Sequence, residues 1–282
     1  MMLETSIESL TNEELENIEY NLVLSAIKKR YGHDFGDYAQ KSLKRRLEHH
    51  VKKLGLNKLT DLINPIIYND TFFGDLLNTI SVPVTEMYRD PSFFYMLREK
   101  VLPLLQTYPN INIWHAGCST GEEVYSMAIM LEEEGLYDNC HIFATDFNAQ
   151  YLKQAQEGIY NYKKIEQYSD NYYASGGKKS FTDYYHDTGD GIKINKKLTR
   201  NITFAKHNLA SDSAFGQFNL ILCRNVLIYF EKQLQNKVFD LFYDSTLPLG
   251  YLCLGSHESL SKRTALEYDT ISNKHKIYRK KK

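Results

Sequence analysis

The chain has 282 residues, 43% of them hydrophobic, which is enough for two domains with cores of their own. Its 34 Lys and Arg residues nearly balance its 35 Asp and Glu residues, and the net charge of −1 removes any general electrostatic argument for nucleic acid or an anionic membrane as the partner. No stretch approaches the roughly 20 apolar residues that cross a bilayer, and the acidic, polar start MMLETSIESL is unlike a signal peptide. We therefore expect a cytoplasmic protein that does not insert into a membrane.

The first eighty residues are predicted to form a small helical bundle. Thr11-x-x-Glu14 is a capping box, and it opens a helix that ends near Gly32. The apolar residues at helical spacing in this helix are Leu15, Ile18, Leu22 and Ile27. Asn64-Pro65 interrupts a later helical pattern, and Asp70 is placed to cap another helix.

A second helix, over about 37–54, carries a concentrated positive charge. Its apolar face consists of Leu43, Leu47, Val51 and Leu54, and the helix stops at Gly55. The segment KSLKRRLEHHVKK contains six Lys and Arg residues against one Glu, among them Lys41, Lys44, Arg45 and Arg46. A solvated face is the ordinary explanation, and an acidic partner such as nucleic acid or a carboxylate-rich helix is the alternative.

The segment VPVTEMYRDPSFF (82–94) joins this helical half, residues 1–85, to the remainder of the chain, 86–282. Thr85 and Arg89 are four residues apart and would share one face of a helix. A junction is also a common place for a cleft. The residues alone slightly favour a linker with a capping threonine.

From residue 110 short apolar runs alternate with amphipathic helices, a pattern that predicts an α/β, doubly wound and mostly parallel sheet. The predicted strands are 111–116, 141–146, 202–208, 218–225 and 250–256, and the predicted helices lie near 121–134, 148–157 and 231–243. A final hairpin, EYDTIS and HKIYRKK, would add an antiparallel edge. The tyrosine-rich stretch 160–200 fits neither period, and it is either a small inserted β subdomain or a surface insertion without chemistry.

The turn AGCSTGEE (116–123) lies between a predicted strand and helix, at the edge where such sheets bind ligands. Asp146 ends the next strand, as an acid that binds a ribose would. Glu122 and Glu123 would repel a pyrophosphate, and they suit a cationic nucleoside such as S-adenosylmethionine. The alternative is that both acids only complement the helix dipole.

Polar residues also end two other predicted strands. Arg224 and Asn225 interrupt an apolar run, and Asn208 ends the preceding strand on the same edge. Buried polar groups are costly unless they bind something. Tyr229 follows five residues after Arg224 and would reach the same place. A structural pairing of Arg224 with a helix end is the alternative.

Five stretches occur in the order and spacing of the CheR-type chemotaxis receptor methyltransferases: VTEMYRDPSFF, AGCSTGEEVYSMA, ATDFNAQYLKQAQEGIY, FNLILCRNVLIYF and GYLCLGSHESL. The chain resembles that family over nearly all of residues 20–280, including the basic helix. The resemblance implies an N-terminal helical domain and a Rossmann-like class I methyltransferase domain. It also implies methylation of receptor glutamates with S-adenosyl-L-methionine, giving glutamyl methyl esters and S-adenosyl-L-homocysteine.

The same resemblance implies roles for individual residues. Thr85 and Arg89 would contact the methionine part of the cofactor or the reacting centre, and Glu123, after Gly117, would bind its ammonium group. Asp146 would bind the ribose, and Asn208 with Leu209 would frame the adenine. Arg224, Asn225 and Tyr229 would line the transfer site, with Arg89, Arg224 and Tyr229 as the catalytic set. Lys41, Lys44, Arg45 and Arg46 would face the receptor's cytoplasmic methylation helices.

The chain departs from the family pattern in three places. Pro83-Val84-Thr85 replaces Asn-x-Thr, and Gly255-Ser256-His257-Glu258-Ser259 exchanges a His and a Ser. The turn in HDTGDGIKI is shorter than in members that dock on a receptor's C-terminal pentapeptide, which predicts a pentapeptide-independent enzyme. We expect a monomer, no bound metal, and four reduced cysteines, because these form no C-x-x-C pair.

Overall fold

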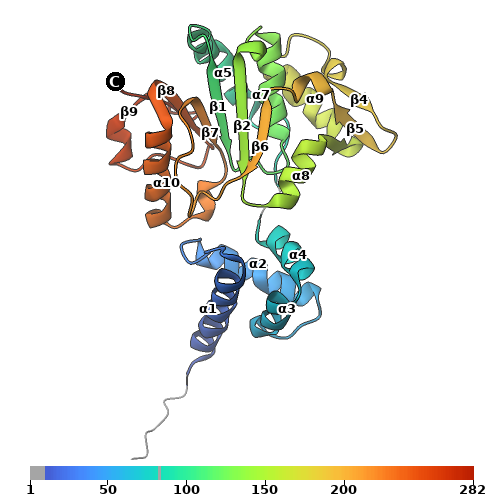
Figure 1. The fold of residues 1–282 in the computed structure, drawn as a ribbon, viewed down its shortest axis with the longest axis vertical. Helices are drawn as coiled ribbons and strands as arrows, with labels where there is room; N and C mark the ends of the chain where they lie inside the picture. Colours follow the sequence, from blue (N-terminus) through green and yellow to red (C-terminus); the bar gives the residue numbers. More distant parts are fainter. Residues whose placement is uncertain (1–9, 82–83) are drawn as a thin grey trace, which may run out of the picture. The chain divides into compact units, whose positions relative to one another are not determined.

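The computed structural model describes residues 10–81 and 84–282. The chain divides into two compact units, Met1–Val82 and Pro83–Lys282, and each unit is described by itself. In the N-terminal unit the helices are α1 (Asn12–Tyr31), α2 (Gln40–Lys53), α3 (Ile63–Tyr68) and α4 (Asp70–Ile80) (Figure 1). The predicted capping box is present, with Thr11 Oγ1 accepting the Glu14 N–H at 3.3 Å, and Gly32 ends α1 in the left-handed region.

The predicted apolar face of α1 is wrong. Leu15, Ile18 and Leu22 are each close to half exposed, and Ile27 alone of the predicted set is buried. The core side consists of Tyr20, Val23, Leu24 and Ile27. Both sets follow helical spacing, so periodicity identified the helix and could not choose between its two apolar faces.

Two smaller predictions for this unit are also corrected. On α2, Leu43, Leu47 and Val51 are buried as expected, but Leu54 follows the helix and is 44% exposed. Asp70 is the first residue of α4 and not its cap. The cap is Asn69, whose side chain accepts the Phe72 N–H at 3.1 Å, because the residue one position earlier is the one with extended backbone.

The second unit contains a seven-stranded sheet in the order β6-β2-β1-β7-β8-β10-β9. Its strands are β1 (Ile111–Ala116), β2 (Cys140–Asp146), β6 (Ile202–Lys206), β7 (Phe218–Cys223), β8 (Thr246–Leu254), β9 (Tyr268–Ser272) and β10 (Ile277–Lys280). The first five pair in parallel, and β10 pairs antiparallel with β8 and β9. This arrangement confirms the predicted doubly wound sheet with an antiparallel edge.

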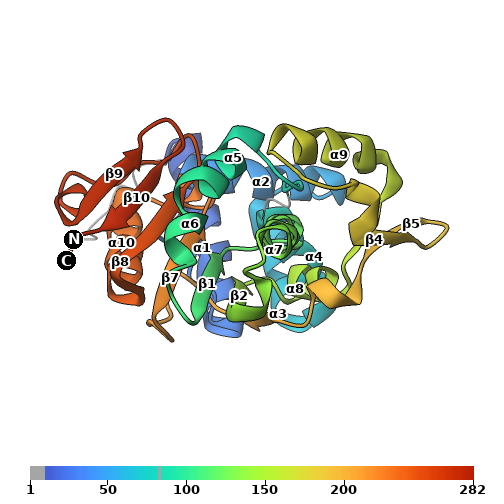
Figure 2. The ribbon, with the colours of Figure 1, turned by 90° about the horizontal axis from the view of Figure 1, so that it is seen from above.

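Helices cover both faces of the sheet. The helices α5 (Pro91–Lys100), α6 (Leu102–Leu105), α7 (Glu122–Glu133) and α8 (Ala149–Glu157) follow or precede β1 and β2, and Figure 2 shows α5, α6 and α7 on one side. The other face packs against α10 (Lys232–Ser245), where the Trp114 ring lies 5.5 Å from that of Phe242. All four cysteines are free and buried.

The stretch 160–200 contains a helix that the sequence analysis missed. A three-stranded sheet, in the order β3-β5-β4, consists of β3 (Ile159–Asn161), β4 (Tyr185–Asp187) and β5 (Gly191–Ile194), and α9 (Ile165–Ala174) lies between β3 and β4. Three of its tyrosines, Tyr168, Tyr172 and Tyr184, are fully buried. Tyr172 and Tyr184 donate their hydroxyls to Glu133 at the end of α7. We call residues 159–198 the insert.

Candidate functional site

The turn between β1 and α7 is fastened to the end of β2. Gly117 N–H and Cys118 N–H both donate to the Thr145 carbonyl, at 2.8 and 2.9 Å. Gly117 has φ +78°, and a Cβ there would lie 2.7 Å from a methyl group of Val226. Glycine is therefore required by both backbone conformation and space. The turn can approach the chain that follows β7 only because Gly117 lacks a side chain.

Asp146, the last residue of β2, points at this turn. Its Oδ2 accepts the Ser119 N–H and its Oδ1 accepts the Asn148 N–H, both at 2.9 Å. Burial raises the pKa of Asp146 above its ordinary value, and the backbone N–H groups oppose that shift. A carboxylate has about four acceptor positions, so the side chain retains capacity to accept hydroxyl groups from a ligand.

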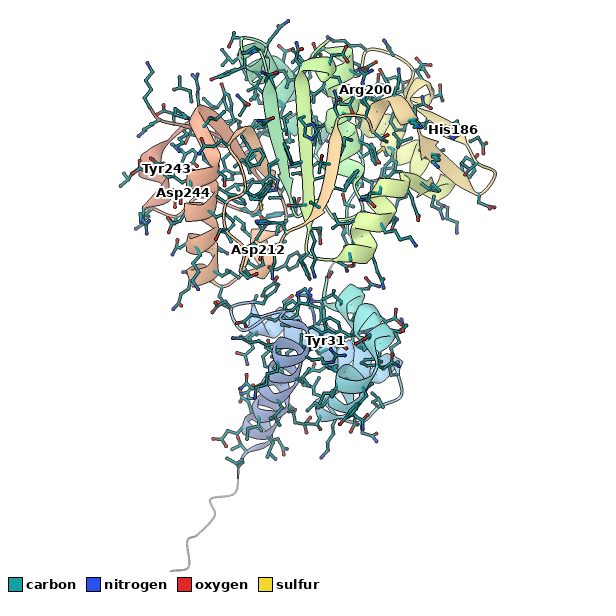
Figure 3. All side chains as sticks on the ribbon, viewed as in Figure 1. Tyr31, His186, Arg200, Asp212, Tyr243 and Asp244 are labelled. Carbon is teal, nitrogen blue, oxygen red and sulfur yellow. The ribbon has the colours of Figure 1, made fainter. Side chains whose placement is uncertain are left out.

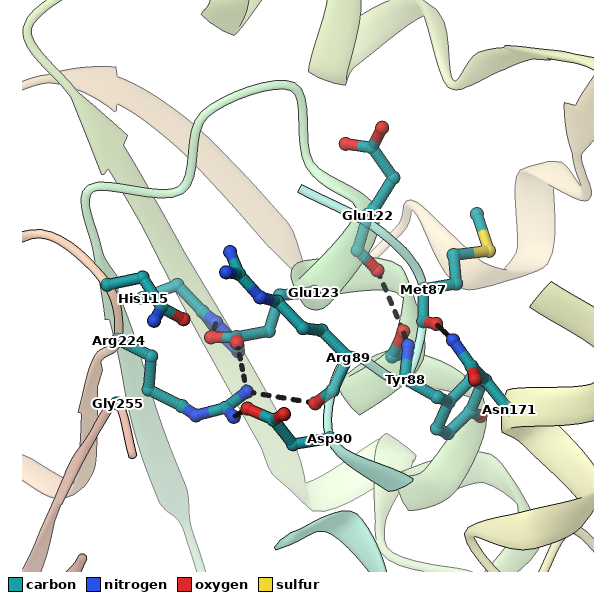
Figure 4. A network of polar contacts seen from close by, with 12 residues as sticks. Met87, Tyr88, Arg89, Asp90, His115, Glu122, Glu123, Asn171, Arg224 and Gly255 are labelled. Atoms are coloured by element: carbon teal, nitrogen blue, oxygen red, sulfur yellow. Dashed lines mark hydrogen bonds and ion pairs between the residues drawn. The ribbon is translucent and has the colours of Figure 1, made fainter. Parts of the chain in front are cut away.

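Glu123 lies in a buried polar network and has two partners in it, Arg224 and His115 (Figure 4). Its Oε2 accepts from Arg224 Nη1 at 2.7 Å, and its Oε1 lies 3.3 Å from His115 Nδ1. Arg224 Nη2 pairs with Asp90 Oδ2 at 2.6 Å, and its guanidinium stacks on the Phe93 ring at 3.9 Å. Burial raises the pKa of Glu123, but Arg224 and His115 outweigh it and lower the pKa to about 2.

Glu122, the neighbouring acid, faces a different environment. Its Oε2 accepts the Thr120 hydroxyl at 2.6 Å, and Tyr168 of α9 donates to its Oε1 at 3.4 Å. Burial raises the pKa of Glu122. The two acids therefore separate: Glu122 connects the turn to the insert, whereas Glu123 faces Arg224.

Thr85 and Arg89 do not share a helix, contrary to the sequence-based expectation. Residues 84–90 have irregular backbone, and Tyr88 and Asp90 have φ of 52° and 59°. The segment is held by Tyr88 N–H, which donates to Ser126 Oγ at 2.8 Å, and by Asn171 of α9, which donates to the Met87 carbonyl. Pro91 follows, so the chain before it is biased away from helix. The departure at Pro83 lies outside the described residues.

Arg89 remains near the rim of the site. Its Nη1 donates to the Val84 carbonyl at 3.0 Å, and its own carbonyl accepts from Arg224 Nη1 at 3.3 Å. Thr85 and Arg89 are both half-buried. The backbone of Arg89 therefore touches the Glu123 network while its guanidinium keeps donors for other partners.

Asn208 and Leu209 follow β6 on the same edge of the sheet. Asn208 N–H donates to Asp212 Oδ2 at 2.9 Å, and Asn208 Oδ1 accepts the Ala210 N–H. Leu209 is buried. Figure 3 labels Asp212 at this edge and Arg200, which precedes β6, at the opposite one. The side chains of Asn208 and Asp212 therefore hold the turn after β6 in shape without a ligand.

The strand β7 ends at Cys223, so Arg224 and Asn225 lie after it and not within it as predicted. Asn225 has φ 61°, and Tyr229 ends a short 3-10 helix, Leu227–Tyr229. Tyr229 is half-buried. The sharp change of direction at Asn225 ends the strand and turns the chain toward Gly117.

Glu258 is a residue of this site that the sequence analysis missed. The residue is 5% exposed, and its carboxylate accepts N–H groups from Asn225, Val226, Ile228 and Gly255. Sequence reasoning noted GSHES only as an altered motif. The local sequence around Glu258 does not indicate that its side chain binds backbone N–H groups about thirty residues earlier in the chain.

Within residues 10–81 and 84–282, three buried polar atoms around the turn lack a protein hydrogen-bond partner: His115 Nε2, Ser119 Oγ and Arg224 Nε. They accompany the carboxylates of Asp146 and Glu123. Buried polar groups are normally paired, and a polar nucleoside with a cationic end would supply partners here. The donor set therefore fits S-adenosylmethionine.

The four basic residues predicted to meet a receptor do not form one surface. Lys41 and Arg45 are exposed on α2. Lys44 pairs with Glu16 of α1 at 2.7 Å, and the Arg46 side chain donates to the carbonyls of Ile80 and Ser42. Exposed His49 and Lys52 instead continue the row of Lys41 and Arg45 along the helix. We call Lys41, Arg45, His49 and Lys52 the basic row.

The described residues, 10–81 and 84–282, contain neither a candidate metal site nor a candidate membrane-spanning helix. No group of three or more His, Cys, Asp or Glu side chains there is arranged to hold a metal ion. In the same part of the chain, no helix has the length and apolar character needed to cross a membrane.

A mostly parallel sheet in this order, with an acid-bearing turn after β1 and a buried carboxylate at the end of β2, defines a Rossmann-like methyltransferase that uses S-adenosylmethionine. Residues 83–277 match the family described as CheR methyltransferase, SAM binding domain, and residues 18–81 match CheR methyltransferase, all-alpha domain. The chain belongs to the CheR methyltransferase family.

Curated relatives align along most of the chain. The “Putative methyltransferase Cher3” of Pseudomonas putida is 40% identical over 272 residues, 96% of this chain and 100% of that protein. Chemotaxis protein methyltransferase 1 of Vibrio cholerae is 33% identical over 258 residues, 87% of this chain and 90% of that protein. Among solved structures, the N-methyltransferase NodS of Bradyrhizobium japonicum with S-adenosyl-L-homocysteine matches 70% of this chain and 89% of its own, with 13% identity and a TM-score of 0.40.

Proposed function

We propose that the protein methylates glutamate side chains on the cytoplasmic helices of chemoreceptors. The products are glutamyl methyl esters and S-adenosyl-L-homocysteine. Family membership supports the methyltransferase activity and the cofactor, and the printed name of the Vibrio cholerae relative supports a role in chemotaxis. The observation that carries the acceptor class is half-buried Arg89, whose carbonyl accepts from Arg224 in the Glu123 network and whose guanidinium keeps donors for another partner, because a cation there suits an anionic acceptor.

Six residues are assigned to the cofactor. The carboxylate of Asp146 accepts the ribose hydroxyls, and the turn of Asn208 and Leu209 borders the adenine. Glu123 attracts the ammonium group, because its pKa of about 2 keeps it ionised. Gly117 allows the close approach of the turn, and Thr85 contacts the methionine part.

Arg224, which the family resemblance placed in the catalytic set, is assigned a different role. Its side chain is 2% exposed and lies between Glu123 and Asp90. A guanidinium already shared by two carboxylates is poorly placed to hold a third. We assign Arg224 to fixing Glu123, Asn225 to lining the transfer site, and Arg89 with Tyr229 to orienting the acceptor.

The bound cofactor supplies an electrophilic methyl group on a sulfonium. A glutamate with an ordinary pKa of about 4.3 is ionised at neutral pH, so the chain need not supply a general base. Its contribution is alignment, which in well-oriented systems amounts to roughly 7 to 11 kcal/mol. Arg89 holds the acceptor carboxylate, and Tyr229 directs one oxygen without neutralising the nucleophile.

The insert supports independence from a receptor's C-terminal pentapeptide. The turn from β4 to β5 is closed by Thr188 N–H, which donates to the Gly191 carbonyl at 3.0 Å. This leaves a tight turn with Gly189 at φ 88°. We expect receptors lacking the pentapeptide to be methylated at the same rate as full-length receptors; a large loss of rate would contradict this part of the proposal.

The central test is incubation of the full chain with methyl-labelled S-adenosylmethionine and receptor-enriched membranes. Methyl groups on the receptor band that are released by alkali are expected, since carboxyl methyl esters hydrolyse in base. Alkali-stable label would identify another acceptor class. Binding of the cofactor with no transfer to any receptor would show a cofactor-binding scaffold, and either result would overturn the proposal.

A further inference from the structure

The carboxylate of Glu258 joins two loops at the carboxyl edge of the sheet. Its Oε1 accepts from Val226 N at 2.9 Å and Ile228 N at 3.3 Å, and its Oε2 accepts from Asn225 N at 3.0 Å and Gly255 N at 2.6 Å. Three of these donors lie in the loop after β7 and the fourth follows β8. One side chain therefore uses its full acceptor capacity on backbone amides.

These bonds hold an uncommon backbone conformation. Asn225 has φ 61°, in the left-handed region that few non-glycine residues adopt, asparagine more readily than most. Glu258 binds the amide of Asn225 itself and the amide of the next residue. Charge-assisted bonds are stronger than those between neutral groups, so the carboxylate is well suited to impose this bend.

The space around Gly255 shows how closely the two loops meet. A Cβ on Gly255 would lie 2.7 Å from Asn225 N, 2.8 Å from Glu258 Oε2 and 2.9 Å from Asn225 Nδ2. Real Cβ atoms do not approach backbone this closely. The loop after β7 can therefore approach Gly255 and Glu258 this closely only because Gly255 lacks a side chain.

We propose that Glu258 is a positioning residue for methyl transfer. It fixes the bend at Asn225, and the bend directs Arg224 toward Glu123 and sets the position of Tyr229. Glu258 touches neither the cofactor nor the acceptor in this assignment. The expected effect of Glu258 on methyl transfer rests on the proposed function. The claim that Glu258 holds the bend at Asn225 rests on the hydrogen bonds alone.

The test compares Glu258→Gln with the wild type in the full chain. The amide is the same size, but its NH2 group donates, so two of the four backbone N–H groups lose their acceptor. Amide hydrogen exchange at the pair that loses its acceptor, residues 225 and 255 or residues 226 and 228, is expected to accelerate at least roughly tenfold. Receptor methylation is expected to lose turnover by a similar factor, with a smaller change in the KM for S-adenosylmethionine.

Two controls separate positioning from general stability. Ile129→Val removes one methyl group from the buried face of α7, and it should lower the melting temperature without changing exchange at the four amides. Glu258→Asp keeps the carboxylate and is expected to recover part of the lost turnover. The inference also requires that these four amides exchange slowly in the wild type. That measurement can be made even if the variants fail to fold.

Several outcomes would overturn the assignment of Glu258 as a positioning residue. Unchanged exchange in Glu258→Gln, or rapid exchange of these amides in the wild type, overturns the inference. Faster exchange with wild-type turnover leaves Glu258 as a purely structural residue and also overturns it. If the wild type itself transfers no methyl group to receptors, the proposed function fails, whereas the exchange comparison still decides whether Glu258 holds the loop.

Discussion

At the scale of single residues, the site depends on which charges face each other. Glu122 and Glu123 are adjacent in sequence, yet one is held by Thr120 and Tyr168 and the other by Arg224 and His115. The sequence alone indicated that the two acids in this turn disfavour a pyrophosphate and suit a cationic nucleoside. It could not show that Arg224 would be neutralised by Glu123 and Asp90, since those contacts join segments more than a hundred residues apart.

The low pKa of Glu123 predicts a pH-dependent stability. The folded pKa of about 2 lies below the ordinary 4.5, so this carboxylate stabilises the fold above pH 4.5 and loses that contribution as the pH falls toward 2. The difference corresponds to roughly 3 kcal/mol. Glu123→Gln should therefore lower the free energy of unfolding in urea most at pH 7, and the gap to the wild type should shrink below pH 4.5. A gap that is constant from pH 7 to 3 would contradict the assignment.

Tyr229 should affect turnover and not cofactor affinity. Tyr229→Phe removes only a hydroxyl, and the loss of one hydrogen bond to a charged group is expected to lower kcat roughly tenfold, with the Kd for S-adenosylmethionine unchanged in calorimetry. Tyr243→Phe is the matched control, since Tyr243 is also half-buried and lies on α10 (Figure 3). Equal kcat values for the two variants would remove Tyr229 from the proposed catalytic set.

At the scale of elements, the sequence predicted the sheet well and the insert poorly. The strands β1 and β7 are mostly apolar runs, so the sequence predicted the bounds of β1 and the first residue of β7, although β7 ends at Cys223 and not at residue 225. The helix α9 was missed because its buried residues are tyrosines with hydroxyl partners on α7, and tyrosine is not diagnostic of a helix. On α1 the period was right and the buried face was wrong, because apolar residues occur on both sides.

The basic row on α2 gives a prediction for this helix. Lys41→Glu with Arg45→Glu reverses two exposed charges and should raise the KM for receptor methylation, more strongly at low salt, with cofactor affinity unchanged. Arg46 is unsuitable for this test because its side chain binds the Ile80 carbonyl. Lys100→Glu with Lys196→Glu makes the same charge change on exposed residues that precede β1 and β6. If both double variants behave alike, net charge and not α2 determines docking.

At the scale of the whole molecule, every residue assigned to the cofactor belongs to the unit Pro83–Lys282. Calorimetry of the full chain should therefore show one transition that responds to S-adenosylmethionine and one that does not. At a hundred times the Kd, the ligand adds about 2.7 kcal/mol to its unit, which should raise that transition by roughly 5 to 10 °C. NAD at the same concentration should shift neither, because Glu122 and Glu123 disfavour a pyrophosphate. A shift of both transitions would place part of the cofactor site in Met1–Val82.

The buried cysteines have a practical consequence for following such changes in solution. Cys118, Cys140, Cys223 and Cys253 are all enclosed, and burial raises the pKa of each thiol, to about 12 for Cys140. Reagents that attack thiolates at neutral pH will find little to react with in the folded chain. A single cysteine introduced in the basic row of α2 can therefore be labelled selectively without replacing any native cysteine. Such a label would allow receptor docking to be followed by fluorescence or spin-label measurements.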